Sequence, residues 1–239
     1  MERGPKPCST AAYTQKHAMA AVSPQVGLRE RKKQRTRQAI VEVGTDLFVR
    51  QGYQQTTLAQ IAEAADVSPS TFFNYFDTKV EVVFCLFDAV IESARRRIAE
   101  RPEGEPAIQA VAAWLTEELE SVEQPYEGAI RRFPAIISSA PELLAEERLR
   151  QAQLEDVLAA GFARDLGESP DGVRARVLAA IALRAMLEAW AAWFEKHATD
   201  ADFHLSEALG AKAVYVMAAL ERGLEMVDSL PGPPDPASL

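Results

Sequence analysis

The sequence has few of the residues from which enzymes and metal proteins build their sites. Its 239 residues include two cysteines and three histidines. Cys8 and Cys85 cannot supply a disulfide framework, and His197 and His204 lie seven residues apart across a predicted helix break, which is not a zinc-ligand spacing. A glycine-rich phosphate loop, a G-x-S-x-G elbow and an H-E-x-x-H motif are all missing. We therefore expect no enzyme activity, no metal and no cofactor.

Long apolar runs are missing as well. No stretch approaches the ~20 residues that a membrane-spanning helix needs. The first residues contain no apolar segment behind a basic start, which a secretory signal would have. We expect a cytoplasmic protein that does not contact a membrane.

Negative charge predominates overall, but it is concentrated in one part of the chain. The net charge is −9, and residues 86–239 carry fifteen Lys/Arg against twenty-seven Asp/Glu. Residues 29–85 carry eight and seven, and five of those eight bases are Arg31, Lys32, Lys33, Arg35 and Arg37. A basic segment on an acidic body is the layout of a protein that turns one end to DNA. A solvated helix face would also explain the run.

Strand-type alternation does not persist anywhere, and neither a βαβ unit nor an internal repeat is present. Apolar residues recur at helical spacing instead, which predicts an all-α fold of about nine helices. Residues 1–28 are interpreted as a flexible arm and residues 231–239, with four prolines, as a disordered tail. The expected helices are 31–51, a short one after Thr57, a short one after Ser68, one from Thr78 onward, and 106–122, 127–139, 141–166, 172–197 and 203–228.

The segment Thr56–Lys79 carries the functional signal. Two helices of about eight residues are separated by a short turn at Asp66-Val67, the spacing of a helix-turn-helix. Ser68 is a good N-cap, and Pro69 suits the first helical position. In such a motif the N-terminal end of the second helix enters the major groove. Small and polar side chains are needed there, and the chain offers Ser68, Ser70, Thr71 and Asn74, while Phe72 and Phe76 would face the core.

This segment resembles the TetR family of repressors. The matching stretches are TTLAQIAEAADVS and STFFNYFDTK, preceded by RTRQAIVEVGTDLFVRQGYQQTT, in which an apolar helix ends at a glycine before an aromatic residue. The resemblance covers about residues 31–85. It implies a helix-turn-helix domain over 29–78 and a helical effector-binding and dimerisation domain over 79–230.

The resemblance also implies roles for single residues. Thr57 would touch a phosphate, and Ser70, Thr71 and Phe73 would reach base edges or a thymine methyl. Tyr75 and Lys79 would hold the DNA backbone, and a basic arm would contact phosphates or the minor groove through Arg31, Lys32, Lys33 and Arg35. Phe73 stands where the family often has tyrosine, and Asp66 where it usually has glycine. Each residue also has a structural interpretation: Phe73 or Tyr75 in the core, Thr57 as a helix cap, and Asn74 or Lys79 simply exposed.

The family's C-terminal half holds a small-molecule pocket and forms a homodimer through the last two long helices, here about 173–197 and 203–227. Residues that would line the pocket are Trp114, Phe133, Phe162, Met186, Trp190 and Trp193. Each of these side chains could equally be ordinary core. The charge of the effector stays open. Arg131 and Arg132 would suit an acidic effector, whereas the net negative charge of the C-terminal half would suit a cationic one.

The sequence therefore predicts a dimeric repressor that leaves a near-palindromic operator when a small molecule binds, with the helix from Thr78 linking the two domains. An activator with the same mode of DNA binding, and a helical adaptor that no longer binds DNA, are the alternatives.

Overall fold

A computed structural model describes residues 28–121, 126–197 and 222. Within these ranges the chain is all helical and contains no strand. The described helices are α2 (Leu28–Gln51), α3 (Leu58–Ala64), α4 (Pro69–Phe72), α5 (Lys79–Ala99), α6 (Ala107–Ser121), α7 (Glu127–Ser138), α8 (Pro141–Leu166) and α9 (Val173–His197). The predicted all-α fold is confirmed, and the expected helix 203–228 lies outside the described residues except for residue 222. None of the described helices is long and apolar enough to cross a membrane.

Local chemistry sets the helix boundaries of the N-terminal half. Gly52 adopts a φ of +91°, which ends α2 as a left-handed residue and directs Tyr53 back onto Phe48, their ring centroids 5.2 Å apart. Asp66 adopts a φ of 54° between α3 and α4. Aspartate tolerates this conformation better than most residues, so the turn forms without a glycine.

The second helix of the motif is shorter than expected. The sequence suggested about seven or eight residues, but α4 spans four, Pro69–Phe72. The chain then continues in turn conformation, in which Tyr75 N and Phe76 N donate to Phe72 O at 2.9 and 3.1 Å. Phe72 and Phe76 are each only 1% exposed. Burial of these two rings, and not helix length, therefore holds the segment in place, since so short a helix has little stability of its own.

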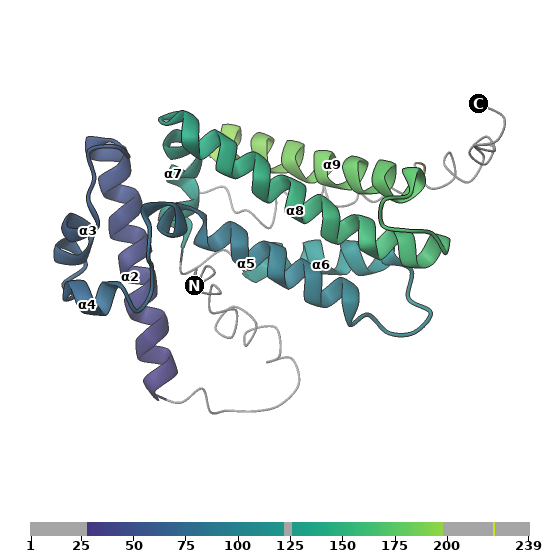
Figure 1. The fold of residues 1–239 in the computed structure, drawn as a ribbon, viewed down its shortest axis with the longest axis horizontal. Coiled ribbons are helices and arrows are strands. Elements are labelled where there is room, and N and C mark those ends of the chain that lie inside the picture. The colour runs from purple at the N-terminus through teal and green to yellow at the C-terminus, as the bar shows by residue number, and fades with distance from the viewer. Residues whose placement is uncertain (1–27, 122–125, 198–221, 223–239) are drawn as a thin grey trace, which may run out of the picture.

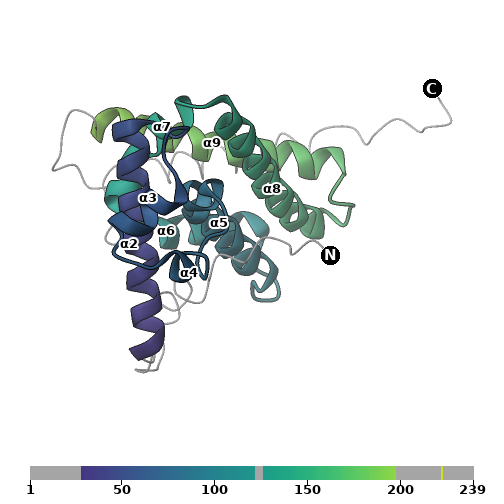
Figure 2. The same ribbon diagram turned by 60° about the vertical axis from the view of Figure 1, so that its left-hand side comes forward.

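The helices form two bodies that meet at α7 (Figure 1). Helices α2, α3 and α4 stand at one end, with the N-terminal turns of α2 projecting past α4, and α5, α6, α8 and α9 lie side by side in the larger body. Turning the molecule by 60° brings α2, α3 and α4 to the front and shows α4 away from α8 and α9 (Figure 2).

Two hydrophobic clusters of buried side chains correspond to these bodies, but the division does not follow the chain. The N-terminal cluster contains Ile40, Phe48, Ile61, Phe72 and Phe76, and it continues into α5, α7 and the start of α8 through Val82, Phe84, Ala129, Ile136, Ile137 and Leu143. The C-terminal cluster joins α5, α6, α8 and α9. Helix α7 is thus packed against the helix-turn-helix although it lies more than fifty residues further along the chain.

Candidate functional site

The exposed face of α4 carries the polar residues that the sequence analysis singled out. Ser68 caps the helix, its Oγ accepting from Thr71 N at 3.1 Å. The same Oγ lies 3.0 Å from Ser70 Oγ and 2.8 Å from Thr71 Oγ1, so three hydroxyls form one small cluster at the helix start. Asn74 and Phe73 are exposed, Phe73 by 45%. Phe73 is therefore not a core residue, and an aromatic ring beside hydroxyls is available to a groove lined by base edges and methyl groups.

Thr57 begins α3 with a full capping box. Its Oγ1 accepts from Gln60 N at 3.2 Å, and Gln60 Oε1 accepts from Thr57 N at 2.8 Å. The hydroxyl is exposed at a helix N-terminus, where backbone N–H groups and the helix dipole favour an anion such as a phosphate.

Lys79 has internal partners that the sequence did not reveal. Its Nζ donates to Tyr53 O at 2.7 Å and lies 4.4 Å from the centroid of the Tyr53 ring. Burial lowers the pKa of Lys79, and Glu142 opposes that shift. Burial, together with Glu142 and Glu146, raises the pKa of Tyr53 to about 12. Lys79 thus holds the loop that follows α2. Tyr75, four residues before Lys79, is partly buried against the N-terminal cluster.

Basic residues occupy the first turns of α2. Arg31, Lys32, Lys33 and Arg35 are all exposed. They belong to a regular helix and not to an extended arm. Arg37, one turn further on, stacks its guanidinium 4.4 Å from the centroid of Phe76. This part of α2 therefore presents a positive surface held at a fixed angle to α4.

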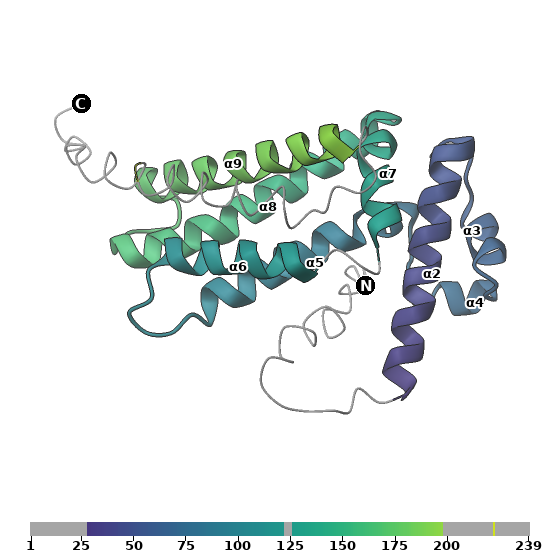
Figure 3. The same ribbon diagram turned by 180° about the vertical axis from the view of Figure 1, so that it is seen from behind.

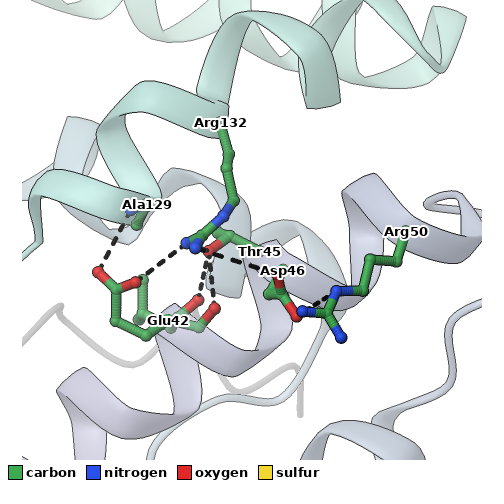
Figure 4. A network of polar contacts seen from close by, with 7 residues as sticks. Glu42, Thr45, Asp46, Arg50, Ala129 and Arg132 are labelled. Atoms are coloured by element: carbon green, nitrogen blue, oxygen red, sulfur yellow. Dashed lines mark hydrogen bonds and ion pairs between the residues drawn. The ribbon is translucent and has the colours of Figure 1, made fainter. Parts of the chain in front are cut away.

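A polar network fastens α2 to α7 (Figure 4). Glu42 Oε2 accepts from Arg132 Nη1 at 3.0 Å, and Glu42 Oε1 accepts from Ala129 N at 3.2 Å. Arg132 Nη1 also lies 3.4 Å from Thr45 Oγ1, and its Nη2 is 4.0 Å from Asp46 Oδ1. The N-cap residue of α7 makes no side-chain capping bond. A carboxylate from α2 therefore takes the place of the missing cap, with the sign of charge that a helix N-terminus prefers.

Gly128 allows this approach. A Cβ at position 128 would lie 2.7 Å from Glu42 Oε2 and 3.0 Å from Arg132 Nη1, so both side-chain ends would have to shift to make room for it. We call Glu42, Gly128, Ala129 and Arg132 the α2–α7 clamp.

A cavity of about 950 Å³ lies between the two bodies. Its apolar walls come from α5, α7 and α9 and include Leu86, Val90, Ile130, Phe133, Met186 and Trp190. Leu144, Glu147 and Gln151 form the α8 wall, and the exposed N-terminal half of α2 contributes Arg31, Lys33 and Arg35. The wall is mostly apolar, and charged side chains of α2, α8 and α9 lie along it. A mostly apolar hollow is the usual form of a small-molecule site.

The structure brings together only part of the predicted pocket. Phe133, Met186 and Trp190 line the cavity, but Trp114 and Phe162 do not. Both are 2% exposed in the C-terminal cluster, and Trp114 Nε1 donates to Ser93 Oγ at 2.9 Å. Complete packing between helices leaves these rings no surface for a ligand. The side chain of Trp193 lies outside the described residues.

Sequence reasoning missed the clamp and Glu147. The sequence offered Arg132 only as a partner for an acidic effector, and Glu42 has the appearance of an ordinary solvated charge on a helix. Their sequence separation of 90 residues removes any local signal for the pairing. Glu147 stands between Glu146 and Arg148 in a charged stretch, so only the fold distinguishes it from its neighbours.

Comparison with known proteins adds independent findings. A family model described as "Bacterial regulatory proteins, tetR family" matches residues 40–84, and one described as "MftR C-terminal domain" matches residues 105–221. The chain is 35% identical to the HTH-type transcriptional regulator TcmR of Streptomyces glaucescens, over 65% of this chain and 71% of that protein. It is 27% identical to a protein named MftR from Mycobacterium tuberculosis, over 80% of this chain and 94% of that one.

Solved structures match the fold. A SmeT–triclosan complex aligns with a TM-score of 0.53 at 20% identity, covering 85% of this chain and 99% of that one. NalD, the secondary repressor of the MexAB-OprM multidrug efflux pump in Pseudomonas aeruginosa, aligns with a TM-score of 0.53 at 19% identity, covering 80% and 97%. At such identities the likeness concerns the arrangement of helices alone.

Proposed function

The chain belongs to the TetR family of transcriptional regulators, and on this premise we propose that it is a repressor which a small molecule releases from operator DNA. The ligand enters the cavity between the two bodies and favours an arrangement in which α4 no longer fits the major groove. Release then follows from a difference in ligand affinity between the two arrangements.

One observation carries the proposal: α7 belongs to both functional parts. Ala129 and Ile137 of α7 line the cavity and are also members of the N-terminal cluster. The same helix is tied to α2 by the clamp. A ligand that displaces α7 must therefore either carry the helix-turn-helix along or break buried contacts. The linking helix expected from the sequence was α5, and the packing supports α7 as a second link.

The DNA-facing surface follows from exposure and chemistry. The hydroxyls of Ser68, Ser70 and Thr71 with Asn74 and Phe73 meet base edges, and the N-terminus of α3 at Thr57 meets a phosphate. Arg31, Lys32, Lys33 and Arg35 meet further phosphates or the minor groove. Lys79 acts through the loop it holds, because Tyr53 O occupies one of its donors. Tyr75 donates its hydroxyl to the DNA backbone.

Dimerisation uses α9 together with the segment after it. An exposed stripe runs along α9 through Val173, Val177 and Ala180. Val173 is 73% and Val177 38% exposed, whereas Ala179 and Leu183 on the other side are buried. Apolar positions left exposed at helical spacing suit a second copy of the chain. A two-fold dimer would place its two α4 helices about one DNA turn apart, roughly 34 Å.

A fluorescence-anisotropy titration against the upstream region of the protein's own gene tests the DNA-binding part. It is run at two salt concentrations with random duplex as the control. Binding to the upstream region should exceed binding to random DNA, and both should weaken as salt rises.

Weak binding without preference for the upstream region would contradict autoregulation and favour the adaptor alternative. Specific binding with reduced transcription of the target gene on deletion of the protein would identify an activator instead of a repressor.

A further inference from the structure

The α8 wall of the cavity contains an acidic side chain, Glu147, which an apolar ligand alone would not require. Leu144, Glu147 and Gln151 stand three and four residues apart, so they share one face of α8, and all three line the cavity. The Glu147 carboxylate is half-buried there. No hydrogen bond or ion pair joins it to another residue of the part of the chain that the structure describes. A desolvated carboxylate without a partner is costly, and this cost favours a partner supplied from outside.

The neighbouring cations are not available to Glu147. Arg150, one turn along α8, is only 12% exposed and is bound to Asp88 Oδ1 at 2.7 Å and to Glu146 Oε2 at 2.6 Å. Arg148 is exposed and acts on Glu147 only through its charge, which lowers the pKa of the carboxyl by less than burial raises it. A positively charged group would therefore be stabilised at this wall.

A second wall offers another hydrogen-bond acceptor. Pro134 lies inside α7 and has no N–H. The carbonyl of Ile130, four residues earlier, therefore lacks its usual helical donor. Both residues line the cavity. A residue of the α7 wall thus has a carbonyl without its usual helical donor.

Positive charge along the cavity lies at the α2 end and at Arg184 of α9, and Arg184 is exposed and ion-paired with Glu188. Arg31, Lys33 and Arg35 are exposed, so water and salt screen their attraction for an anion. A charge near Glu147 is less screened, because the carboxylate is partly removed from water.

We propose that the cavity takes a ligand with a flat apolar body and one protonated amine, and that Glu147 determines this preference by binding the ammonium group. The inference deepens the proposed function, on which it rests for its regulatory meaning. Phe133 and Trp190 provide aromatic surface for the apolar body, and aromatic faces also attract a cation.

Three fluorescent probes with one body and different polar groups test the proposal: 9-(aminomethyl)anthracene, 9-anthracenemethanol and 9-anthracenecarboxylate. Anisotropy titrations with the full chain should give tighter binding of the amine than of the carboxylate by about 10- to 100-fold, the range expected for a charge-assisted hydrogen bond. Glu147→Gln should remove most of that difference and leave the affinity for the alcohol within about threefold, since the apolar contacts are unchanged. Glu103→Gln removes the same charge at an exposed loop position and should leave the preference intact.

Equal affinity for amine and carboxylate, no binding of the amine, or a preference that survives Glu147→Gln would each overturn the proposal. Thermal unfolding of the variant would show whether it is folded, and the alcohol then reports whether the cavity is intact. If the amine binds with the expected preference and the operator complex is unaffected, the proposed ligand response fails while the role of Glu147 stands. If only the alcohol or carboxylate binds and releases the operator, the ligand response stands and the role of Glu147 fails.

Discussion

The α2–α7 clamp makes a quantitative prediction about coupling between the two bodies. Arg132→Met keeps most of the aliphatic stem but removes the guanidinium, which leaves Glu42 with Ala129 N as its remaining donor. Glu42→Gln keeps an acceptor for Ala129 N and removes the charge opposite Arg132. The two single variants and the double variant form a double-mutant cycle.

The structure bounds the size of the effect. The side chains of Arg132 and Glu42 are 31% and 30% exposed, so the pair lies between a surface ion pair, about 0–1 kcal/mol, and a buried charge-assisted hydrogen bond, about 1.5–3 kcal/mol. Arg132 also keeps a distant acceptor in Asp46, 4.0 Å away. We expect each single change to lower the free energy of unfolding by about 1–2 kcal/mol and the coupling energy to be about 1 kcal/mol.

Urea unfolding of the four proteins measures the coupling. Arg95 and Glu92 on α5 provide the control cycle, because they are 58% and 46% exposed and 3.7 Å apart, and their coupling should not exceed about 0.5 kcal/mol. In the clamp variants, ligand should also weaken operator binding less than it does in the unaltered protein. In the control variants, the effect of ligand on operator binding should be unchanged. A clamp coupling as small as the control value, with an unchanged ligand response, would refute the reasoning.

Three further results are expected. Phe72→Ala should lower the free energy of unfolding by about 3–5 kcal/mol in a denaturation assay and abolish specific operator binding, because the ring is 1% exposed and anchors a four-residue helix; a loss below about 1 kcal/mol would contradict this anchoring. Lys32→Ala should reduce the salt dependence of operator binding by about one phosphate contact without changing sequence preference, and an unchanged slope would remove Lys32 from the interface. Burial raises the pKa of Glu147 above its ordinary 4.5, so the folded protein holds that proton more tightly and loses stability as pH rises from about 4.5 through the folded-state pKa. Glu147→Gln should therefore match the unaltered protein in melting temperature near pH 4 and exceed it at neutral pH, and an equal or lower value at neutral pH would count against a desolvated carboxylate.

Local sequence signals determined most of the helix-turn-helix. Gly52 ends α2, Thr57 and Ser68 cap the next two helices, and Asp66 forms the turn between them, each as its own chemistry predicts. These features depend on neighbours within a few residues, so they can be interpreted without the fold. The length of α4 was predicted less well, because long-range burial of Phe72 and Phe76 replaces hydrogen-bonded helix there.

Tertiary structure alone decided the cavity and its contact with the helix-turn-helix. Trp114 and Phe133 are both aromatic residues on amphipathic helices, yet packing buries the first and turns the second to a cavity. Glu42 and Arg132 meet across 90 residues, and no periodicity encodes a pairing between helices so far apart. Sequence thus determined which segments are helical and which end carries the helix-turn-helix and the basic run, because propensity, capping and charge act locally. Which aromatic rings face the cavity and which charges are bound depends on how the helices pack, since burial and partners are properties of the whole fold.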